Sequence, residues 1–248
     1  MISLLSLRVA TWNVHSFIGT DGRKEPRRTL AVLQELDADV IALQEVECHG
    51  KDGLAAMAAL HSELLLGPAC PARSGFGNAV VSRFPVENLR VHDLSVAGFE
   101  PRNVVDLQLR VAASVPSVRL RVLATHLGLD ARERRSQADQ LVAILDDTRA
   151  GPADITVLLG DLNALDRQEF SVQPLLARFA PALPVRSFPA LLPMLRLDRV
   201  LVLSPAVVAV ATHRSRLARV TSDHLPVTGT VVWSGSGKVA VDAVRRAR

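Results

Sequence analysis

The chain has 248 residues, of which 48% are hydrophobic, 4% aromatic and 22% charged, and its formal net charge at pH 7 is +4. This length fits one large domain, and the apolar content suffices for a sizeable core, which excludes an intrinsically disordered chain. The positive charge is weak evidence for a nucleic-acid partner, because residues 238–248 hold four basic side chains against one acidic one and the rest of the chain carries only +1.

Other classes of protein are disfavoured by what the sequence lacks. It contains no tyrosine and few other aromatics, which argues against a protein that stacks single-stranded bases. Cys48 and Cys70 do not make a disulfide framework and indicate a reduced compartment. No apolar stretch approaches the roughly 18–20 residues that a membrane span needs. We therefore expect a cytoplasmic protein with no integral membrane segment, and nothing in the sequence indicates an obligate protein partner.

The first predicted elements alternate between strands and helices, which is typical of α/β proteins. Residues 8–14 are predicted to form a strand. Residues 25–36 are predicted to form a helix with Pro26 in its first turn. A strand over residues 39–46 and an Ala- and Leu-rich helix over residues 53–66 follow.

From residue 78 onward the pattern changes to consecutive strands with turns between them. These strands are predicted at residues 78–83, 88–94, 104–111 and 118–126. Because short turns join them, this part of the chain is expected to be antiparallel.

The second half returns to alternation. A helix is predicted over residues 131–149, where Leu141, Ile144 and Leu145 recur at helical spacing, and another over residues 167–179. The remaining predicted strands are residues 155–160, 197–203, 207–212 and 226–232.

Mixed strand directions with helices before and behind favour two packed sheets in one α/β domain. This domain is predicted to span residues 1–233. After Trp233, the sequence Ser-Gly-Ser-Gly-Lys is typical of a linker. Residues 234–248 are therefore predicted to form a basic, flexible tail.

Several predicted strands end in a polar residue that can take part in metal or phosphate chemistry. They end in Asn13, Glu45, His126 and Asp161, and Asn163 lies two residues further, on the same face of an extended chain as Asp161. Strand ends of α/β sheets are where ligands bind, because the strands hold the groups rigidly. This arrangement predicts a binding or catalytic site.

Each of these residues alone also has an ordinary structural explanation. Glu45 could cap a helix, Asp161 could belong to a turn, and His126 could be a satisfied core histidine. Asp198 could pair with a neighbouring arginine, and Asp223-His224 could simply lead into the last strand. The repeated pattern favours the functional interpretation over these alternatives.

Six short blocks combine the polar residues with their neighbours. In chain order the blocks are Thr11-Trp12-Asn13-Val14-His15, Leu43-Gln44-Glu45-Val46, Gly77-Asn78-Ala79-Val80-Val81-Ser82-Arg83, Thr125-His126-Leu127, Gly160-Asp161-Leu162-Asn163 and Ser222-Asp223-His224-Leu225-Pro226-Val227. Together they resemble the endonuclease/exonuclease/phosphatase superfamily, over the chain from Arg8 to about Val232. The resemblance implies an α/β fold, a four-layer α/β/β/α sandwich of two packed mixed β-sheets flanked by helices, and a metal-dependent phosphoesterase.

Further segments are similar to those of small bacterial members of this superfamily, some of which are encoded beside cardiolipin synthases. The segments are Gly19-Thr20-Asp21-Gly22-Arg23, Gly128-Leu129 with Arg134-Arg135-Ser136-Gln137, and Phe188-Pro189-Ala190. This similarity suggests a phospholipid-related substrate.

The resemblance also implies a divalent cation, either Mg²⁺ or Mn²⁺, whose ligand preferences overlap. Such cations prefer oxygen ligands. Glu45 is expected to be the main ligand, and Asn13 to ligate or orient through its neutral amide. Asp223 is expected to complete the metal shell or to support it from outside.

By the same resemblance, Asp161 would orient or deprotonate the attacking water, and Asn163 would donate to the phosphate oxygens. His224, polarised by Asp198, would stabilise charge on the phosphate, because a carboxylate behind a histidine favours the imidazolium. His126 matches a histidine that contacts phosphate or assists the leaving group in the deoxyribonuclease-like and sphingomyelinase-like branches.

Three residues are expected to bind substrate. Arg102 would clamp phosphate through its guanidinium, or else form an exposed ion pair with Glu100. Asn78 would support the site or bind substrate from the start of its strand. His15 lies close enough to Asn13 in the sequence to line the cleft.

The sequence leaves three functions open. The first is a phosphodiesterase or phosphatase acting on a phospholipid headgroup or another small phosphodiester. The second is a Mg²⁺-dependent nuclease on DNA or RNA, and the third is an inactive scaffold on the same fold. Asp198-Arg199 stands where many relatives carry Asp-His or Asp-Tyr, and the absence of tyrosine disfavours an abasic-site endonuclease.

Overall fold

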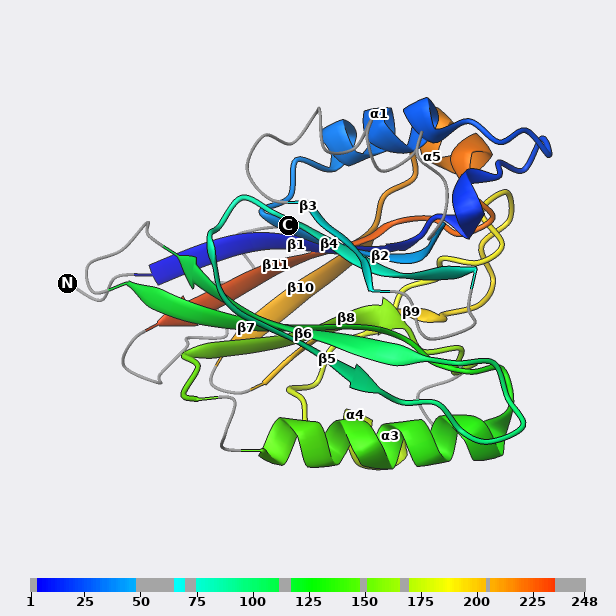
Figure 1. Cartoon of the computed structure of the whole chain (residues 1–248). Helices are drawn as coiled ribbons and strands as arrows, with labels where there is room; N and C mark the ends of the chain where they lie inside the picture. Colours follow the sequence, from blue (N-terminus) through cyan, green and yellow to red (C-terminus); the bar gives the residue numbers. More distant parts are fainter. Residues whose placement is uncertain are drawn as a thin grey trace.

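Two β-sheets form the centre of the computed structural model, which describes residues 4–47, 65–69, 75–111, 117–147, 151–165, 170–203 and 206–234 (Figure 1). The first sheet contains β1 (Leu4–Asn13), β2 (Val40–Glu47), β3 (Leu65–Ala69), β4 (Phe76–Ser82), β10 (Val207–Thr212) and β11 (Val227–Ser234). The second contains β5 (Val86–Asp93), β6 (Asn103–Val111), β7 (Val118–His126), β8 (Ile155–Asp161) and β9 (Asp198–Val202). Their spatial orders are β10-β11-β1-β2-β4-β3 and β5-β6-β7-β8-β9.

Helices cover the outer face of each sheet. On the first sheet lie α1 (Pro26–Leu36) and α5 (Arg216–Thr221), and on the second lie α3 (Ala131–Asp146) and α4 (Gln173–Leu176) (Figure 1). A short 3-10 turn, η1 (His15–Phe17), follows β1. This order of layers confirms the predicted four-layer sandwich. Among the described residues, no helix combines the length and the apolar character needed to cross a membrane.

Hydrophobic cores fill the space between successive layers. In β7, Val122 and Ala124 face the core between the sheets, whereas Leu123 faces the core beneath α3. In β1, Val9 and Ala10 divide in the same way between the inner core and the core beneath α1. Because successive side chains of a strand point to opposite faces, these strands are apolar on both sides. Their sequences therefore form continuous apolar runs.

The polar residues at the strand ends lie on the same strand face as the apolar residues of the inner core. Residues two apart share a face, so Val157 and Leu159 of the inner core lead directly to Asp161. The pair Val122 and Ala124 leads in the same way to His126. The side chains that would extend the apolar layer are thus replaced, at this end, by groups able to carry charge.

Strand register brings these ends together. β1 pairs in parallel with β2, and β7 with β8, so within each sheet the carboxyl ends of the pair lie side by side. The hydrogen bond from Asn13 to Asp161 shows that the ends of the two pairs also meet between the sheets. His126 is the register partner of Asp161, and Asp161 is the partner of Asp198 across the antiparallel pair β8 and β9. The sheet pairing alone places three predicted site residues side by side.

The prediction of antiparallel pairing for the four consecutive strands is confirmed for β4 with β2 and β3, and for β5, β6 and β7 with one another. The four strands do not form one sheet, however. β4 belongs to the other sheet, where it pairs with β2 and β3. The chain leaves the first sheet at the turn after Ser82, whose hydroxyl accepts a hydrogen bond from the amide of Phe84. Pro85 follows and has no N–H to continue a ladder.

Two helix predictions need correction. Most of the helix predicted over residues 53–66 lies outside the described residues, but its last two positions belong to strand β3. The helix predicted over residues 167–179 begins outside them too, and only Gln173–Leu176 is helical. Pro174 lacks an N–H and fits only a first turn. The amides of Arg178 and Phe179 then donate three residues back, which tightens and ends the helix.

The helix predicted over residues 131–149 ends at Asp146, and residues 148–150 are outside the described part of the chain. The tail from residue 235 onward is outside it as well. The Asp130 side chain begins α3 by accepting from the amides of Arg132 and Glu133, as a helix cap does.

β7 and β8 approach each other closely at Gly160, one residue before the polar end of β8 at Asp161. A Cβ added there would lie 2.3 Å from the backbone oxygen of Thr125. We expect Gly160→Ala to lower the free energy of unfolding by about 1–3 kcal/mol, because the strands must move apart. Gly75→Ala is the matched control, since nothing lies within 4 Å of its added Cβ. Urea denaturation measures both variants, and equal midpoints would contradict the explanation.

Candidate functional site

Glu45 is turned into the site by an irregularity in β2. The register of β2 against β4 shifts between Leu43 and Val46, and Glu45 has a positive φ of 53°. A bulge of this kind redirects one side chain out of the regular alternation. Burial raises the pKa of Glu45 and the Asp223 carboxylate raises it further, against the opposing hydrogen bond from Asn13. The site therefore holds a carboxylate whose charge is poorly compensated.

Asn13 joins the two sheets. Its Nδ2 donates to Glu45 Oε1 at 2.8 Å and to Asp161 Oδ2 at 3.2 Å. Its Oδ1 accepts from the amide of His15 at 3.0 Å. Its backbone oxygen accepts from the hydroxyl of Ser222 at 2.7 Å. All polar groups of this side chain are thus engaged in orienting neighbours.

His15 and Asp223 lie on one side of this centre. Nδ1 of His15 is 3.7 Å from Asp223 Oδ1 and 3.1 Å from the backbone oxygen of Ile18. His15 begins the left-handed turn of η1, and both its side chain and that of Asp223 are partly exposed. The structure places His15 beside the candidate metal ligands rather than in the centre of the cleft.

Asp161 is buried and has a carboxylate held from several directions. Its Oδ1 accepts from the amide of Asn163 at 2.9 Å, and Asn163 adopts a left-handed conformation with φ of 51°. The Asn163 Nδ2 donates to the backbone oxygen of Leu127 at 2.8 Å. The Gly-Asp-Leu-Asn turn therefore serves both to close the backbone and to aim two side chains into the cleft.

His224 is held as an imidazolium by Asp198. Their Nδ1 and Oδ2 are 2.9 Å apart, and the same Oδ2 accepts from the hydroxyl of Ser187. Burial opposes the charged form, but the Asp198 carboxylate overcomes it and raises the pKa of His224 to about 10. The Phe188 ring packs 4.7 Å from the imidazole, and Trp12 Nε1 donates to the backbone oxygen of His224 at 2.9 Å. The orientation of the ring is thus set by Asp198 and Phe188, and Trp12 holds the backbone that carries it.

His126 is held in the opposite state, as a neutral imidazole. Burial lowers its pKa to about 3, helped by the Arg102 guanidinium, whose Nη1 lies 3.1 Å from Nδ1. Arginine can only donate, so Nδ1 accepts and the ring proton lies on Nε2. Nδ2 of Asn163 lies 3.1 Å from that Nε2, which brings two N–H donors face to face. An oxygen that accepted from both would relieve this contact.

The Nε2 atoms of His126 and His224 both point toward the Asp161 carboxylate. Nε2 of His126 and Nε2 of His224 each lie 3.7 Å from Asp161 Oδ2, which is too long for a direct hydrogen bond. N–H donors from the two histidines and Asn163 therefore surround a point beside one carboxylate. This geometry suits an anion with several acceptor oxygens.

Arg102 forms the expected ion pair with Glu100, but it is buried rather than exposed. Besides its contact with His126, its Nη2 donates to Glu100 Oε2 at 3.0 Å. The arginine is buried whereas Glu100 is largely exposed. Arg102 Nε has no hydrogen-bond partner among the described residues. The guanidinium is thus placed on the wall of the site with its charge only partly balanced by a solvated partner.

A cleft of about 420 Å³ opens over these groups. Its lining includes the candidate site residues Asn13, Glu45, Arg102, His126, Asp161, Asn163 and His224. Asn78 lies behind it in a small recess, where its Nδ2 donates to the backbone and side-chain oxygens of Asn103. Asp198 is buried behind His224. The structure thus gathers the predicted residues, with Asn78 and Asp198 behind the cleft wall.

Two places could hold a cation. Asp161, Asp198 and His224 bring potential ligand atoms within 4.8 Å of one another. However, the Asp198 carboxylate raises the pKa of His224 and so favours its imidazolium form. An imidazolium has no lone pair to offer to a cation. Glu45 and Asp223 fit a cation better, because they are two neighbouring carboxylates and burial disfavours the charge on the first.

Several residues that support the site are not among the predicted site residues. Ser187 donates to Asp198, and Phe188 packs on His224. The Ser222 hydroxyl also accepts from the amide of His224 at 3.2 Å. Ser222 stands in one of the six blocks and could have been identified there. No sequence signal points to Ser187, which depends on the folded loop before β9.

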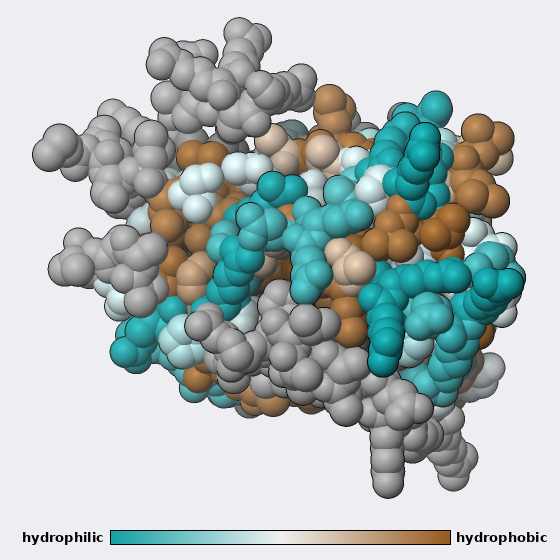
Figure 2. All heavy atoms as spheres, turned by 90° about the horizontal axis from the view of Figure 1, so that it is seen from above, coloured by the Kyte–Doolittle hydropathy of each residue, from teal (hydrophilic) through white to brown (hydrophobic). Residues whose placement is uncertain are grey.

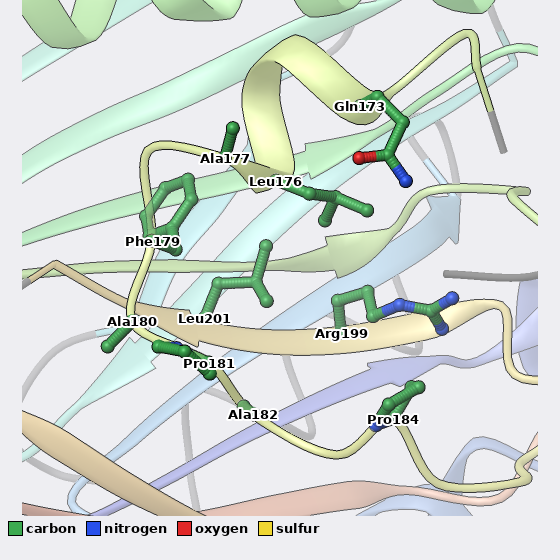
Figure 3. Close-up of a pocket in the computed structure, with 10 residues that line it drawn as sticks. All are labelled: Gln173, Leu176, Ala177, Phe179, Ala180, Pro181, Ala182, Pro184, Arg199 and Leu201. Carbon is green, nitrogen blue, oxygen red and sulfur yellow. The ribbon is translucent and has the colours of Figure 1, made fainter. Parts of the chain in front are cut away.

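A second pocket, of about 320 Å³, lies between α4, the following loop and the edge strand β9 (Figure 3). Arg199 lines it and donates to the backbone oxygens of Asp198 and Ala164, both at 3.3 Å. The other walls are mainly apolar, and none of the predicted site residues lines it. The Arg199 side chain thus lines this second pocket, whereas the neighbouring Asp198 holds His224 of the cleft.

A model of the Endonuclease/Exonuclease/phosphatase family matches residues 10–224. The uncharacterized protein YbhP of Escherichia coli strain K12 is 28% identical over 249 residues, spanning 91% of this chain and 96% of that protein.

Two solved structures from Bacteroides thetaiotaomicron are similar in fold. One is an endonuclease/exonuclease/phosphatase family protein, with a TM-score of 0.74 and 20% identity, covering 97% of this chain and 100% of that chain. The other is the mannosyl-6-phosphatase Bt3783, with a TM-score of 0.70 and 19% identity, covering 92% of this chain and 100% of that chain. At these identities the likeness establishes the fold alone.

The pairing of Asp198 with His224 predicts a pH-dependent contribution to stability. The pKa of His224 in the folded protein, about 10, lies above the ordinary histidine pKa of 6.5. The contribution is therefore complete below pH 6.5 and disappears as the pH rises through about 10. We expect Asp198→Asn to remove it. The difference in unfolding free energy between wild type and variant should then be largest near pH 6.5 and shrink toward pH 10.

Urea denaturation at several pH values measures this difference. Asp139→Asn changes an exposed carboxylate and serves as the control. A difference that stays constant or grows with pH would contradict the pairing.

Proposed function

The chain belongs to the endonuclease/exonuclease/phosphatase family, whose members are phosphoester hydrolases, and we propose that it hydrolyses a phosphate ester with the help of a divalent cation. The observation that carries this proposal is the convergence of the His126 and His224 Nε2 atoms beside the Asp161 carboxylate. Donors of this kind stabilise the charge that develops on a phosphate in the transition state. We favour a phospholipid headgroup or another small phosphodiester as substrate.

Glu45 and Asp223 would hold the cation, which is Mg²⁺ or Mn²⁺ in this proposal. When bound, it would neutralise part of the phosphate charge. Asn13 would orient Glu45 from outside, since its amide donates to that carboxylate and its oxygen is taken by the amide of His15. His15 would support Asp223 in the same way.

Asp161 would orient the attacking water and accept its proton. Its carboxylate is fixed by the amide of Asn163 and by Asn13 Nδ2, so it is held at the floor of the cleft. A carboxylate that accepts one hydrogen bond at each oxygen, from Asn163 at Oδ1 and from Asn13 at Oδ2, keeps a fixed orientation and can hold a water in line with the phosphorus.

His224, Asn163 and His126 would bind the phosphate oxygens. His224 brings a full positive charge, because Asp198 keeps it protonated. His126 brings a neutral Nε2–H, because Arg102 occupies its other nitrogen. A ring with so low a pKa donates a hydrogen bond but transfers no proton near neutral pH. We therefore assign His126 to phosphate contact, with Arg102 beside it as a clamp.

The test compares hydrolysis of supercoiled plasmid, a phospholipid panel and a generic aryl phosphodiester, with Mg²⁺ and with Mn²⁺. Asp161→Ala and His224→Ala should each lower turnover by at least about 10²–10³-fold, the typical cost of losing a placed transition-state donor. Asp139→Ala, on the exposed face of α3, is the control. Circular dichroism checks that the variants fold.

Near-wild-type turnover in either variant would defeat the assignment of roles. Nicking of the plasmid that depends on Asp161, with no cleavage of the other substrates, would replace the proposal by a nuclease. Absence of any cleavage would favour the inactive scaffold.

The cation site has its own test in thermal stability. A ligand that binds only the folded state raises the melting temperature, so Mg²⁺ should stabilise the wild type and Glu45→Gln should lose most of that shift. Glu47→Gln is a matched control, two residues further along β2, where Glu47 pairs with Lys24 outside the cleft. Equal Mg²⁺ shifts in the two variants would remove Glu45 from the metal site.

A further inference from the structure

Part of the cleft wall is apolar. Leu129 and Leu165 both line the cleft, and they are 76% and 56% exposed. Phe76, Phe188 and Leu197 continue the same lining. Leucine side chains this exposed at the mouth of a polar cleft gain nothing from folding, which makes them candidates for contact with a ligand.

Leu129 is held in this exposed position by α3. The amide of Gly128 donates to Gln137 Oε1 at 2.8 Å, and Arg134 Nη1 donates to the backbone oxygen of Leu129. The Glu133 carboxyl packs against Gly128 so closely that a Cβ there would lie 1.8 Å from it. The turn that carries Leu129 is therefore fixed at its amide, its carbonyl and its Cα. A leucine displayed on so rigid a turn is preorganised for binding.

The apolar surface continues beyond the cleft. Phe188 and Leu195 form an isolated bridge, and the loop between them exposes Leu191, Leu192 and Met194 by 61%, 67% and 58%. Figure 2, which views the molecule from above, shows hydrophobic residues among hydrophilic ones at its right-hand end, where this loop lies in Figure 1. A ligand longer than the cleft would therefore meet further apolar side chains.

We propose that this wall binds the hydrocarbon part of the substrate, which would be a phosphate ester of an aliphatic or aromatic alcohol rather than of a sugar or nucleoside. The inference rests on the proposed function for the phosphate end. Leucine and phenylalanine side chains offer no partner to sugar hydroxyls, so a sugar buried there would lose hydrogen bonds to water without replacement. An alkyl or aryl group would instead be stabilised by leaving water.

Binding and hydrolysis are tested separately. The first measurement is calorimetric binding of methyl-, butyl- and octylphosphonate to the full chain with Mg²⁺. The second is kcat/KM for the methyl, butyl and octyl esters of 4-nitrophenyl phosphate, against thymidine 5′-(4-nitrophenyl phosphate). We expect affinity and kcat/KM to rise roughly threefold for each of the first added methylenes. The thymidine ester should be the poorer substrate.

The double variant Leu129→Asn/Leu165→Asn should flatten the dependence on chain length in both measurements. Leu183→Asn is the matched control, because Leu183 is 69% exposed and does not line the cleft. It should leave the octyl-to-methyl ratio unchanged.

Chain-length-independent binding and kcat/KM in the wild type, or an unchanged ratio in the double variant, would overturn the apolar subsite while leaving the phosphoesterase intact. Better turnover of the thymidine ester than of the octyl ester would overturn it as well. Chain-length-dependent phosphonate binding without hydrolysis of any ester would keep the subsite and remove the proposed function. Cleavage of a long-chain ester only in mixed micelles would assign the hydrocarbon to a lipid, and cleavage of the monomeric octyl ester to a small molecule.

Discussion

The apolar layer between the two sheets determines where this molecule can carry charge. Alternate residues of the central strands face that layer, and the same phase runs from Val157 through Leu159 to Asp161. Parallel pairing places such ends side by side within each sheet, for β1 with β2 and for β7 with β8, and the bond from Asn13 to Asp161 joins the two sets. Charged groups that would be costly in the middle of the layer become usable where it opens to solvent. The candidate site is therefore the polar end of the main core.

Two histidines with the same chemistry are driven to opposite states at this edge. His224 faces the Asp198 carboxylate and is protonated, whereas His126 faces the Arg102 guanidinium and is neutral. Burial disfavours charge on both, so the partner behind each ring decides the outcome. The cleft thus offers one charged and one neutral N–H donor toward Asp161. Of the two rings, only His224 brings a positive charge to that point, and the Arg102 guanidinium adds a second one behind His126.

The sequence carried enough information to predict the layers of the fold and the composition of the site. Continuous apolar runs and polar strand ends are local properties, and Asn13 and Asp161 follow from them directly. Contacts made by loops are not local. Ser187 reaches Asp198 only because the segment before β9 folds back. The helix predicted over residues 167–179 includes Pro174, which fits only the first turn of a helix, and only Gln173–Leu176 is helical. The crossing from one sheet to the other after β4 was likewise missed, since a turn sequence does not say which sheet comes next.

The pairing of β1 with β11 has a consequence for how the protein is made. Trp12 and His224 are 212 positions apart, yet the indole of the first donates to the backbone of the second. Ser222 likewise closes on Asn13. During synthesis on a ribosome, β1 therefore waits for its second neighbour until residues 227–234 have been translated. A nascent chain that stops before His224 lacks the charged donor of the cleft, so any activity that needs this donor begins only after residue 224 has been made.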